Sequence, residues 1–228
     1  MFVTLLLVAA VIGPGIASAV TRDFDGFHWE GAMKAGQAIE IKNIFGSIRA
    51  EPSEGNRVEV VASRPGTNFV VTEDAHGVSI RAVQGKASEG DVKVDFSVRV
   101  PRGIRFVGRT VNGSVEANAL LSDAEAYTVN GDVRMSTAGE GEAATVNGSI
   151  VASMGAKHAF RNLKFSSVNG GITLHLPRCW NTALQAGTRH GEVASDVPLS
   201  KRPAPNGQPA VQLTTVNGNI VVRRDLRL

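Results

Sequence analysis

The histidines are the residues of this chain best suited to binding a metal ion or transferring a proton. They are His28, His76, His158, His175 and His190. Their separations do not match the short spacings at which ligands follow one another in zinc-binding motifs. A fold could still gather His175 and His190 from adjacent repeats. We interpret the histidines instead as solvent-facing side chains and predict no metal site.

The carboxylates could supply the acid and base of a glycosidase, whose two carboxyl groups lie about 5–10 Å apart. In the repeated part of the chain, Asp132 and Glu192 occupy equivalent positions just after a glycine, but copies bearing Ser149 and Gly171 separate them. The chain also lacks a G-x-S-x-G elbow, an H-E-x-x-H pair, a Walker loop and a G-x-G-x-x-G turn. The sequence therefore predicts no catalytic residues and no cofactor.

One hexapeptide recurs along the chain. Its five intact copies are TVNGSV (110–115), TVNGDV (128–133), TVNGSI (145–150), SVNGGI (167–172) and TVNGNI (215–220). Such self-similarity is typical of stacked repeat architectures. We assign the motif a structural role and a possible binding face. Its residues are Thr110, Asn112, Gly113, Thr128, Asn130, Gly131, Thr145, Asn147, Gly148, Asn169, Gly170, Thr215, Asn217 and Gly218.

Asn-Gly between apolar residues is also typical of a β-hairpin with a two-residue type I′ turn. A hairpin would place Val111 opposite Ser114, pairing an apolar with a polar residue. The period-2 alternation instead runs through Asn-Gly without changing phase. We therefore favour one strand bent at the glycine, with Val111, Val129 and Val146 facing the core. On this interpretation, aspartate at Val129 or Val146 would prevent folding.

Each repeat also offers a second strand and a loop, and the longest loop is 198–209. Insertions confined to one place per repeat indicate a solenoid with variable loops on one side. Stacked coils would align the asparagines in a column that is either solvent-facing or hydrogen-bonded as a ladder. The copies with Phe45, Arg189 and His190 depart from the motif. Because Arg189 would take a core-facing position, we expect its coil to be locally open or near an edge.

The first half of the chain carries alternating segments with less regular spacing. We expect strands over 38–42, 57–62, 68–72, 78–83 and 92–100. No helical period persists over ten residues outside the N-terminal apolar run. The sequence thus predicts an all-β fold: a β-solenoid-like or β-prism stack with a less regular N-terminal β region. We assign 1–19 to a signal peptide, 20–104 to that region and 105–228 to the repeats, the last two forming one continuous domain.

The N-terminus indicates export. The apolar run 2–12 is about half the length that spans a bilayer, and Ala17 and Ala19 form an A-x-A cleavage site. No second apolar span follows, so the mature chain is expected in the periplasm, at the cell surface or outside the cell. The net charge of +3 comes from scattered residues, which argues against nucleic acid as a partner. Cys179 is alone, so no intrachain disulfide can form.

The combination of these features resembles the bacterial "putative adhesin" family of β-strand-repeat proteins. The resemblance lies in 44–49, 52–60, the VRVPRGI step at 98–104 and the Asn-Gly repeats that follow, and it covers about 38–224. It implies a β-solenoid-like or β-prism fold, an exported or envelope location and no catalytic set.

The function expected from the sequence is that of an exported, non-catalytic binding or scaffolding module of the cell envelope. Its polar face would bind an envelope glycan or an envelope protein. One alternative is a carbohydrate-active β-helix enzyme, either a lyase or a hydrolase. Another is a structural protein that assembles end to end, which the charged C-terminus around Arg223 and Arg224 would oppose.

Overall fold

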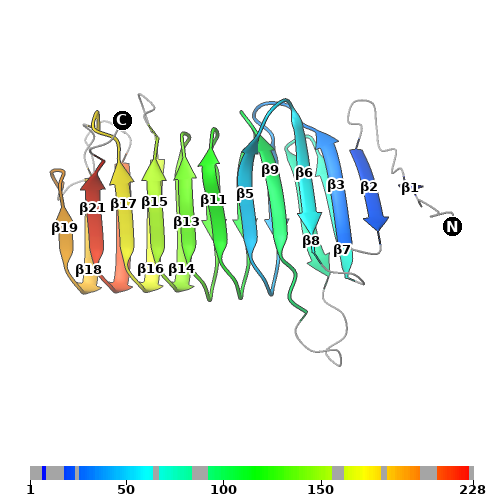
Figure 1. Ribbon diagram of the computed structural model, residues 1–228. Coiled ribbons are helices and arrows are strands. Elements are labelled where there is room, and N and C mark those ends of the chain that lie inside the picture. The colour runs from blue at the N-terminus through cyan, green and yellow to red at the C-terminus, as the bar shows by residue number, and fades with distance from the viewer. Residues whose placement is uncertain are drawn as a thin grey trace.

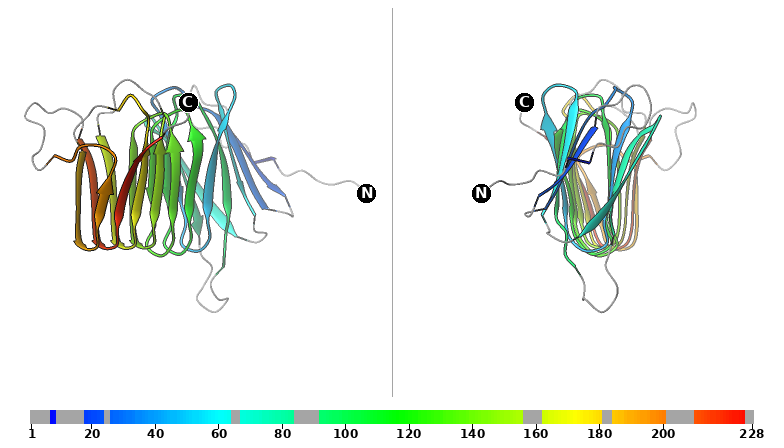
Figure 2. Two further views of the ribbon diagram at one scale, coloured as in Figure 1. Left: turned by 60° about the vertical axis from the view of Figure 1, so that its left-hand side comes forward. Right: turned by 90° about the vertical axis from the view of Figure 1, so that its right-hand side faces the viewer.

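The computed structural model describes residues 7–8, 18–23, 26–63, 67–83, 92–155, 162–180, 184–200 and 210–225. These residues form 21 strands and no helix, which confirms the all-β prediction. The strands make two sheets. In Figure 2 the sheets lie face to face as two layers. Buried side chains from the strands of both sheets form the core.

The first sheet has twelve strands. In spatial order they are β1 (Leu7–Val8), β2 (Ser18–Asp23), β3 (Gly26–Ala32), β6 (Arg57–Ala62), β9 (Phe96–Pro101), β5 (Ile48–Ser53), β11 (Val115–Leu120), β13 (Val133–Thr137), β15 (Ile150–Met154), β17 (Ile172–Leu176), β21 (Ile220–Arg224) and β19 (Val193–Ser195).

The second sheet has nine strands. Their order is β18 (Leu184–His190), β20 (Ala210–Asn217), β16 (Asn162–Asn169), β14 (Gly141–Asn147), β12 (Ala124–Tyr127), β10 (Arg105–Arg109), β4 (Ala38–Lys42), β8 (Gly77–Val83) and β7 (Asn68–Asp74).

The repeated unit is a coil that contains one strand of each sheet. β14, for example, runs along the second sheet, turns a corner at Asn147–Ser149 and continues as β15 in the first sheet. Both strands pair in parallel with their equivalents in the neighbouring coils. Figure 1 shows the corners along one edge of the stack and the connections between coils along the other. The predicted solenoid with one-sided loops agrees with this arrangement for the described residues.

The order of the coils differs from the order of the chain at both ends. β4 and β5 lie between the β8–β9 coil and the β10–β11 coil, and β20 and β21 lie between the β16–β17 coil and the β18–β19 coil. The outermost coil at the C-terminal end is therefore β18–β19, which carries Arg189 and His190 and confirms the expected edge position. Contrary to the expectation from the sequence, the charged C-terminus does not protect that end, because Arg223 and Arg224 lie on β21, inside the sheet.

The core consists mostly of small and branched side chains along the stack, and of aromatic ones at the N-terminal end. A single cluster of buried residues extends from Phe27 to Val222. At the N-terminal end Trp29 is fully buried, and the rings of Phe27 and Phe69 stack with centroids 4.4 Å apart. The antiparallel strands β2, β3, β6 and β7 surround this end. The strand expected at 92–100 begins later, at Phe96, because 92–95 form a corner against Phe45.

Candidate binding face

The Thr-Val-Asn-Gly motif forms the corner between the two sheets. In the coil of β14 and β15, Thr145 is buried, Val146 and Asn147 are exposed, and Ile150 is buried again. The hairpin alternative is wrong, because the strands on either side of the motif lie in different sheets. The chain does bend at Asn-Gly, as expected.

The expected inward orientation of the motif valines is wrong. Val111, Val129 and Val146 are 38–39% exposed. The alternation of inward and outward side chains changes phase at the corner, since several consecutive residues lie on the outside of a sharp turn. The threonine before each valine faces inward instead. Arg189 in the valine position is accordingly exposed, so no buried charge arises there.

The buried threonines join each coil to its neighbour. The Thr145 hydroxyl donates to the carbonyl oxygen of Gly131 at 2.9 Å. Equivalent bonds of 2.8–3.0 Å run from Thr110 to Gly46, Thr128 to Gly113, Ser167 to Gly148, Thr188 to Gly218 and Thr215 to Gly170. Each bond satisfies a carbonyl oxygen that the corner turns away from the regular ladder of the sheets.

The motif glycines allow the corners to stack closely. A Cβ on Gly148 would lie 1.9 Å from the carbonyl oxygen of Gly131, and one on Gly131 would lie 2.1 Å from that of Gly113. Such distances are far inside van der Waals contact. The expected glycine column is therefore a consequence of backbone packing against backbone.

The asparagines form a hydrogen-bonded ladder on the outside of the corner. The Nδ2 group of Asn130 donates to Oδ1 of Asn112, that of Asn147 to Asn130, that of Asn169 to Asn147 and that of Asn217 to Asn169, each at 2.8 Å. The side chains from Asn130 onward are also exposed. The column is thus both solvent-facing and laddered. Within the row, each inner amide keeps one N–H and one oxygen lone pair for water or a partner.

A row of apolar side chains runs beside the asparagine ladder. It contains Ile44, Val111, Val129, Val146, Val168 and the half-buried Val216, one from each of six successive coils. We call this row together with the asparagine ladder the corner ridge. The sequence interpretation placed these valines in the core, and the missed signal was the motif threonine, whose hydroxyl needs a buried acceptor.

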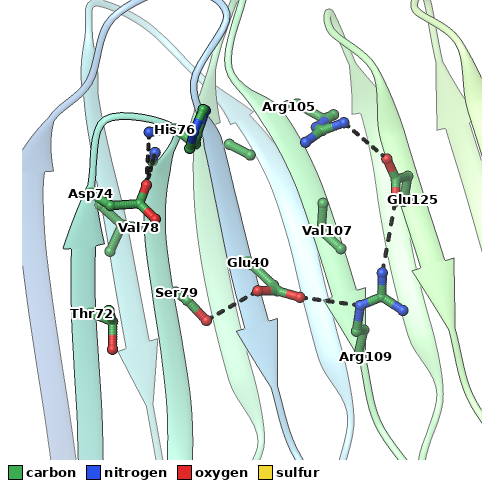
Figure 3. A pocket seen from close by; sticks show the side chains of 12 residues that line it. Glu40, Thr72, Asp74, His76, Val78, Ser79, Arg105, Val107, Arg109 and Glu125 are labelled. Atoms are coloured by element: carbon green, nitrogen blue, oxygen red, sulfur yellow. Dashed lines mark hydrogen bonds and ion pairs between the residues drawn. The ribbon is translucent and has the colours of Figure 1, made fainter.

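The outer face of the second sheet carries a charged groove of about 270 Å³ near its N-terminal end. Figure 3 shows Arg109 between Glu40 and Glu125, with Arg105 on the far side of Glu125. Arg109 lies 3.2 Å from Glu40, and Arg105 lies 3.3 Å from Glu125. The Arg109 guanidinium also lies 4.1 Å from the ring centre of Tyr127. These acids and bases pair with one another, so their charges largely neutralise each other within the groove.

The surroundings shift the pKa values of two of these groups, Glu40 and Tyr127. Partial burial acts to raise the pKa of Glu40, but contacts with Lys42, Ser79 and Arg109 outweigh it and hold that pKa below its usual value. Partial burial and the Glu125 carboxylate, which accepts a hydrogen bond from the phenol at 3.1 Å, raise the pKa of Tyr127 well above its ordinary value of 10.0. The lowered pKa keeps Glu40 ionised, and the raised pKa keeps the Tyr127 phenol protonated, which are the states that these contacts require.

Within the described part of the chain, no three histidine, cysteine, aspartate or glutamate side chains are grouped so that they could hold a metal ion. His175 lies on β17 and contacts Asp225 at 3.2 Å, whereas His190 lies at the corner beside Asn217 in the other sheet. Of the carboxylates that line the groove, Glu40 and Glu125 pair with arginines, and Asp74 accepts hydrogen bonds from the backbone amides of His76 and Gly77. His158 lies outside the described residues.

Two further predictions concern the N-terminus and membranes. Ala17 lies outside the described residues, and Ala19 lies in β2, where it pairs with Glu30 of β3. The signal peptide stays a prediction. Among the described residues, we find no helix with the length and apolar character needed to cross a bilayer.

A scan against protein-family models and a search of curated proteins both find no match. Solved structures of bacterial proteins described as adhesins are similar to this chain. A putative cell adhesion protein from Clostridium sporogenes is 11% identical, with 87% of this chain and 99% of that one covered and a TM-score of 0.49.

Two more such structures have lower TM-scores. A putative adhesin from Bacteroides fragilis is 13% identical over 92% of this chain and 98% of that one, with a TM-score of 0.38. A putative adhesin from Parabacteroides merdae is 10% identical over 95% and 100%, with a TM-score of 0.26. These proteins are of the kind that the sequence resemblance indicates.

Proposed function

We propose that this chain is an exported protein of the bacterial cell envelope that binds a partner through its corner ridge and catalyses no reaction. The ridge carries the proposal. It combines exposed amides with spare hydrogen-bonding groups and a contiguous row of exposed apolar side chains, all fixed to stacked backbone. Binding surfaces are typically built from a few such groups held in place by a rigid scaffold.

Rigidity supports a binding role in particular. Each ridge side chain stands on a corner that is joined to the next by a threonine–glycine bond and close glycine contacts. The backbone beneath the ridge therefore loses little conformational entropy when a partner is bound, which favours affinity.

The location is tested by fractionating cells that make the epitope-tagged chain. We expect the protein in the envelope or outside the cell, and a variant lacking residues 2–19 in the cytoplasm. Cytoplasmic retention of the complete chain would contradict export.

Binding is tested by co-sedimentation with purified envelope material, with the sacculus and the envelope membranes as separate probes. The variant Asn130→Ala/Asn147→Ala should lose binding while its melting curve stays cooperative. Ser153→Ala/Thr173→Ala is the matched control, because both residues are half-buried on the outer face of the first sheet. Equal binding by the ridge variant and the wild type would refute the ridge as the binding face.

A further inference from the structure

We propose that the corner ridge also binds the ridge of a second copy of this chain, so that two stacks associate side by side. The inference rests on the proposed function, because it adds a second partner to the same surface, for which envelope material then competes. The surface involved spans the coils from β4–β5 to β20–β21.

The first observation is the contiguity of the exposed apolar row. Isolated exposed valines are common on soluble proteins, whereas contiguous apolar patches mark interaction sites. Here neighbouring coils place Val146 beside Val168 and Val168 beside Val216 through the pairing of the flanking residues. The asparagine bridges extend the same order back to Phe45. Six coils at a spacing of about 4.8 Å give a row about 24 Å long.

The second observation is the period of that row. An extended strand repeats its side chains on one face every ~6.7 Å, and a helix repeats every ~5.4 Å. Either partner would fall out of step with the ridge within a few coils. Another stack of β-coils has the same period of about 4.8 Å and stays in step along its whole length. This chain provides such a stack, with the same residues at the same heights.

The third observation is chemical self-complementarity. Between Ile44 and Val216 the apolar row and the asparagine ladder contain no charged residue, so like charges do not oppose each other when two ridges meet. The amides both donate and accept, which lets one asparagine ladder bond to another. Identical valine side chains can interdigitate, as like side chains do between paired sheets in steric zippers. A twofold axis relates such identical surfaces.

The size of the ridge sets the expected strength. A ridge about 24 Å long and two side chains wide falls short of the ~800 Å² per partner of a standard stable interface. We therefore expect a reversible dimer that dissociates in the micromolar to millimolar range.

The experiment is sedimentation equilibrium of the purified protein from about 1 µM to 1 mM. We compare the wild type with Val146→Lys on the ridge and Val151→Lys on the outer face of β15. The two valines belong to the same coil and are equally exposed, at 39% each. The wild type should dimerise as its concentration rises. Val146→Lys should weaken dimerisation at least tenfold, and Val151→Lys should change it by less than about twofold.

A second ridge variant, Val129→Thr, keeps the shape of the side chain and guards against misfolding. It should weaken the dimer while its circular dichroism and melting temperature match the wild type. A wild type that stays monomeric up to 1 mM would overturn the proposal. Equal weakening by Val151→Lys would overturn it as well.

The outcome separates this inference from the proposed function. A monomeric protein that still loses envelope binding in Asn130→Ala/Asn147→Ala refutes the dimer and leaves the envelope role intact. A ridge-dependent dimer that stays in the cytoplasm refutes export and leaves the dimer intact.

Discussion

The corner ridge and the outer sheet faces belong to the same coils, yet their residues follow different rules. At the corner the same contacts recur from coil to coil: asparagine bonds to asparagine, glycine packs on glycine, and the threonine hydroxyl bonds to a glycine carbonyl oxygen. On the outer face of the first sheet, Arg49 and Arg134 both pair with Glu116. The equivalent positions of the next two strands hold Val151 and Thr173. The faces therefore vary from coil to coil, whereas the corner repeats.

This difference shows where stacking restricts the choice of residue. Backbone packs against backbone at the corner, so a change of one side chain alters the distance between coils. On the faces, side chains extend into solvent, and exposed ion pairs contribute only about 0–1 kcal/mol each. The following variants test this comparison, from the largest expected effect to the smallest.

Gly148→Ala should have the largest effect of the three motif substitutions, Gly148→Ala, Thr145→Val and Val146→Asp. Its Cβ would overlap the Gly131 carbonyl, and no flexible side chain is available to move aside. We expect a loss of more than about 4 kcal/mol in the free energy of unfolding, measured by urea denaturation. Gly187→Ala on β18 is the control, because no atom lies within 4 Å of its added Cβ. Similar losses for the two variants would break the distinction between corner and face.

Thr145→Val should cost about 1–3 kcal/mol, because it leaves the Gly131 carbonyl oxygen without its hydroxyl donor at nearly unchanged side-chain volume. The same denaturation experiment checks it. Thr173→Val makes the same chemical change on the outer face of β17 and should stay within about 0.5 kcal/mol of the wild type. A neutral Thr145→Val would show that the corner hydroxyl is dispensable.

Val146→Asp should change the free energy of unfolding by no more than about 0.5 kcal/mol, because the side chain is 39% exposed. Thermal melting checks this. The neighbouring Ile150→Asp buries the same charge and should abolish folding. Unfolding of Val146→Asp would restore the inward orientation expected from the sequence.

The pH dependence of Tyr127 tests the charged face alone. Because it is the only tyrosine of the chain, phenolate absorbance reports on it directly. Its pKa is raised in the folded protein, so the phenol should stay protonated well above pH 10 until the chain unfolds. Its contribution to stability is complete below the unfolded pKa of about 10 and declines as pH rises above it. Titration near pH 10 in the folded state would contradict this pairing.

Much of the fold could be predicted from the sequence. The five copies of the motif indicate stacked coils, and the strands at 38–42 and 57–62 have the predicted bounds. The orientation of Val111, Val129 and Val146 could not be predicted from alternation, because a corner interrupts it. Alternation describes a straight strand, and a turn that exposes consecutive residues shifts the phase by one.

The candidate site was predicted in part. The asparagine column was expected, and the structure adds its neighbouring apolar row. The charged groove was not foreseen, because Glu40 lies 69 residues from Arg109 in the chain and only the order of the coils brings them together.

By itself, the sequence determined that this chain is a stack of β-coils, with one column of asparagines and one of glycines running along the stacked corners. Only the tertiary structure decided the order of the coils and which motif residue faces the core. The physical reason is that every intact corner makes the same contacts, so any two intact coils can be neighbours. At the C-terminal end, β18–β19, with Arg189 and His190 in place of valine and asparagine, lies outermost, and β20–β21 lies just inside it.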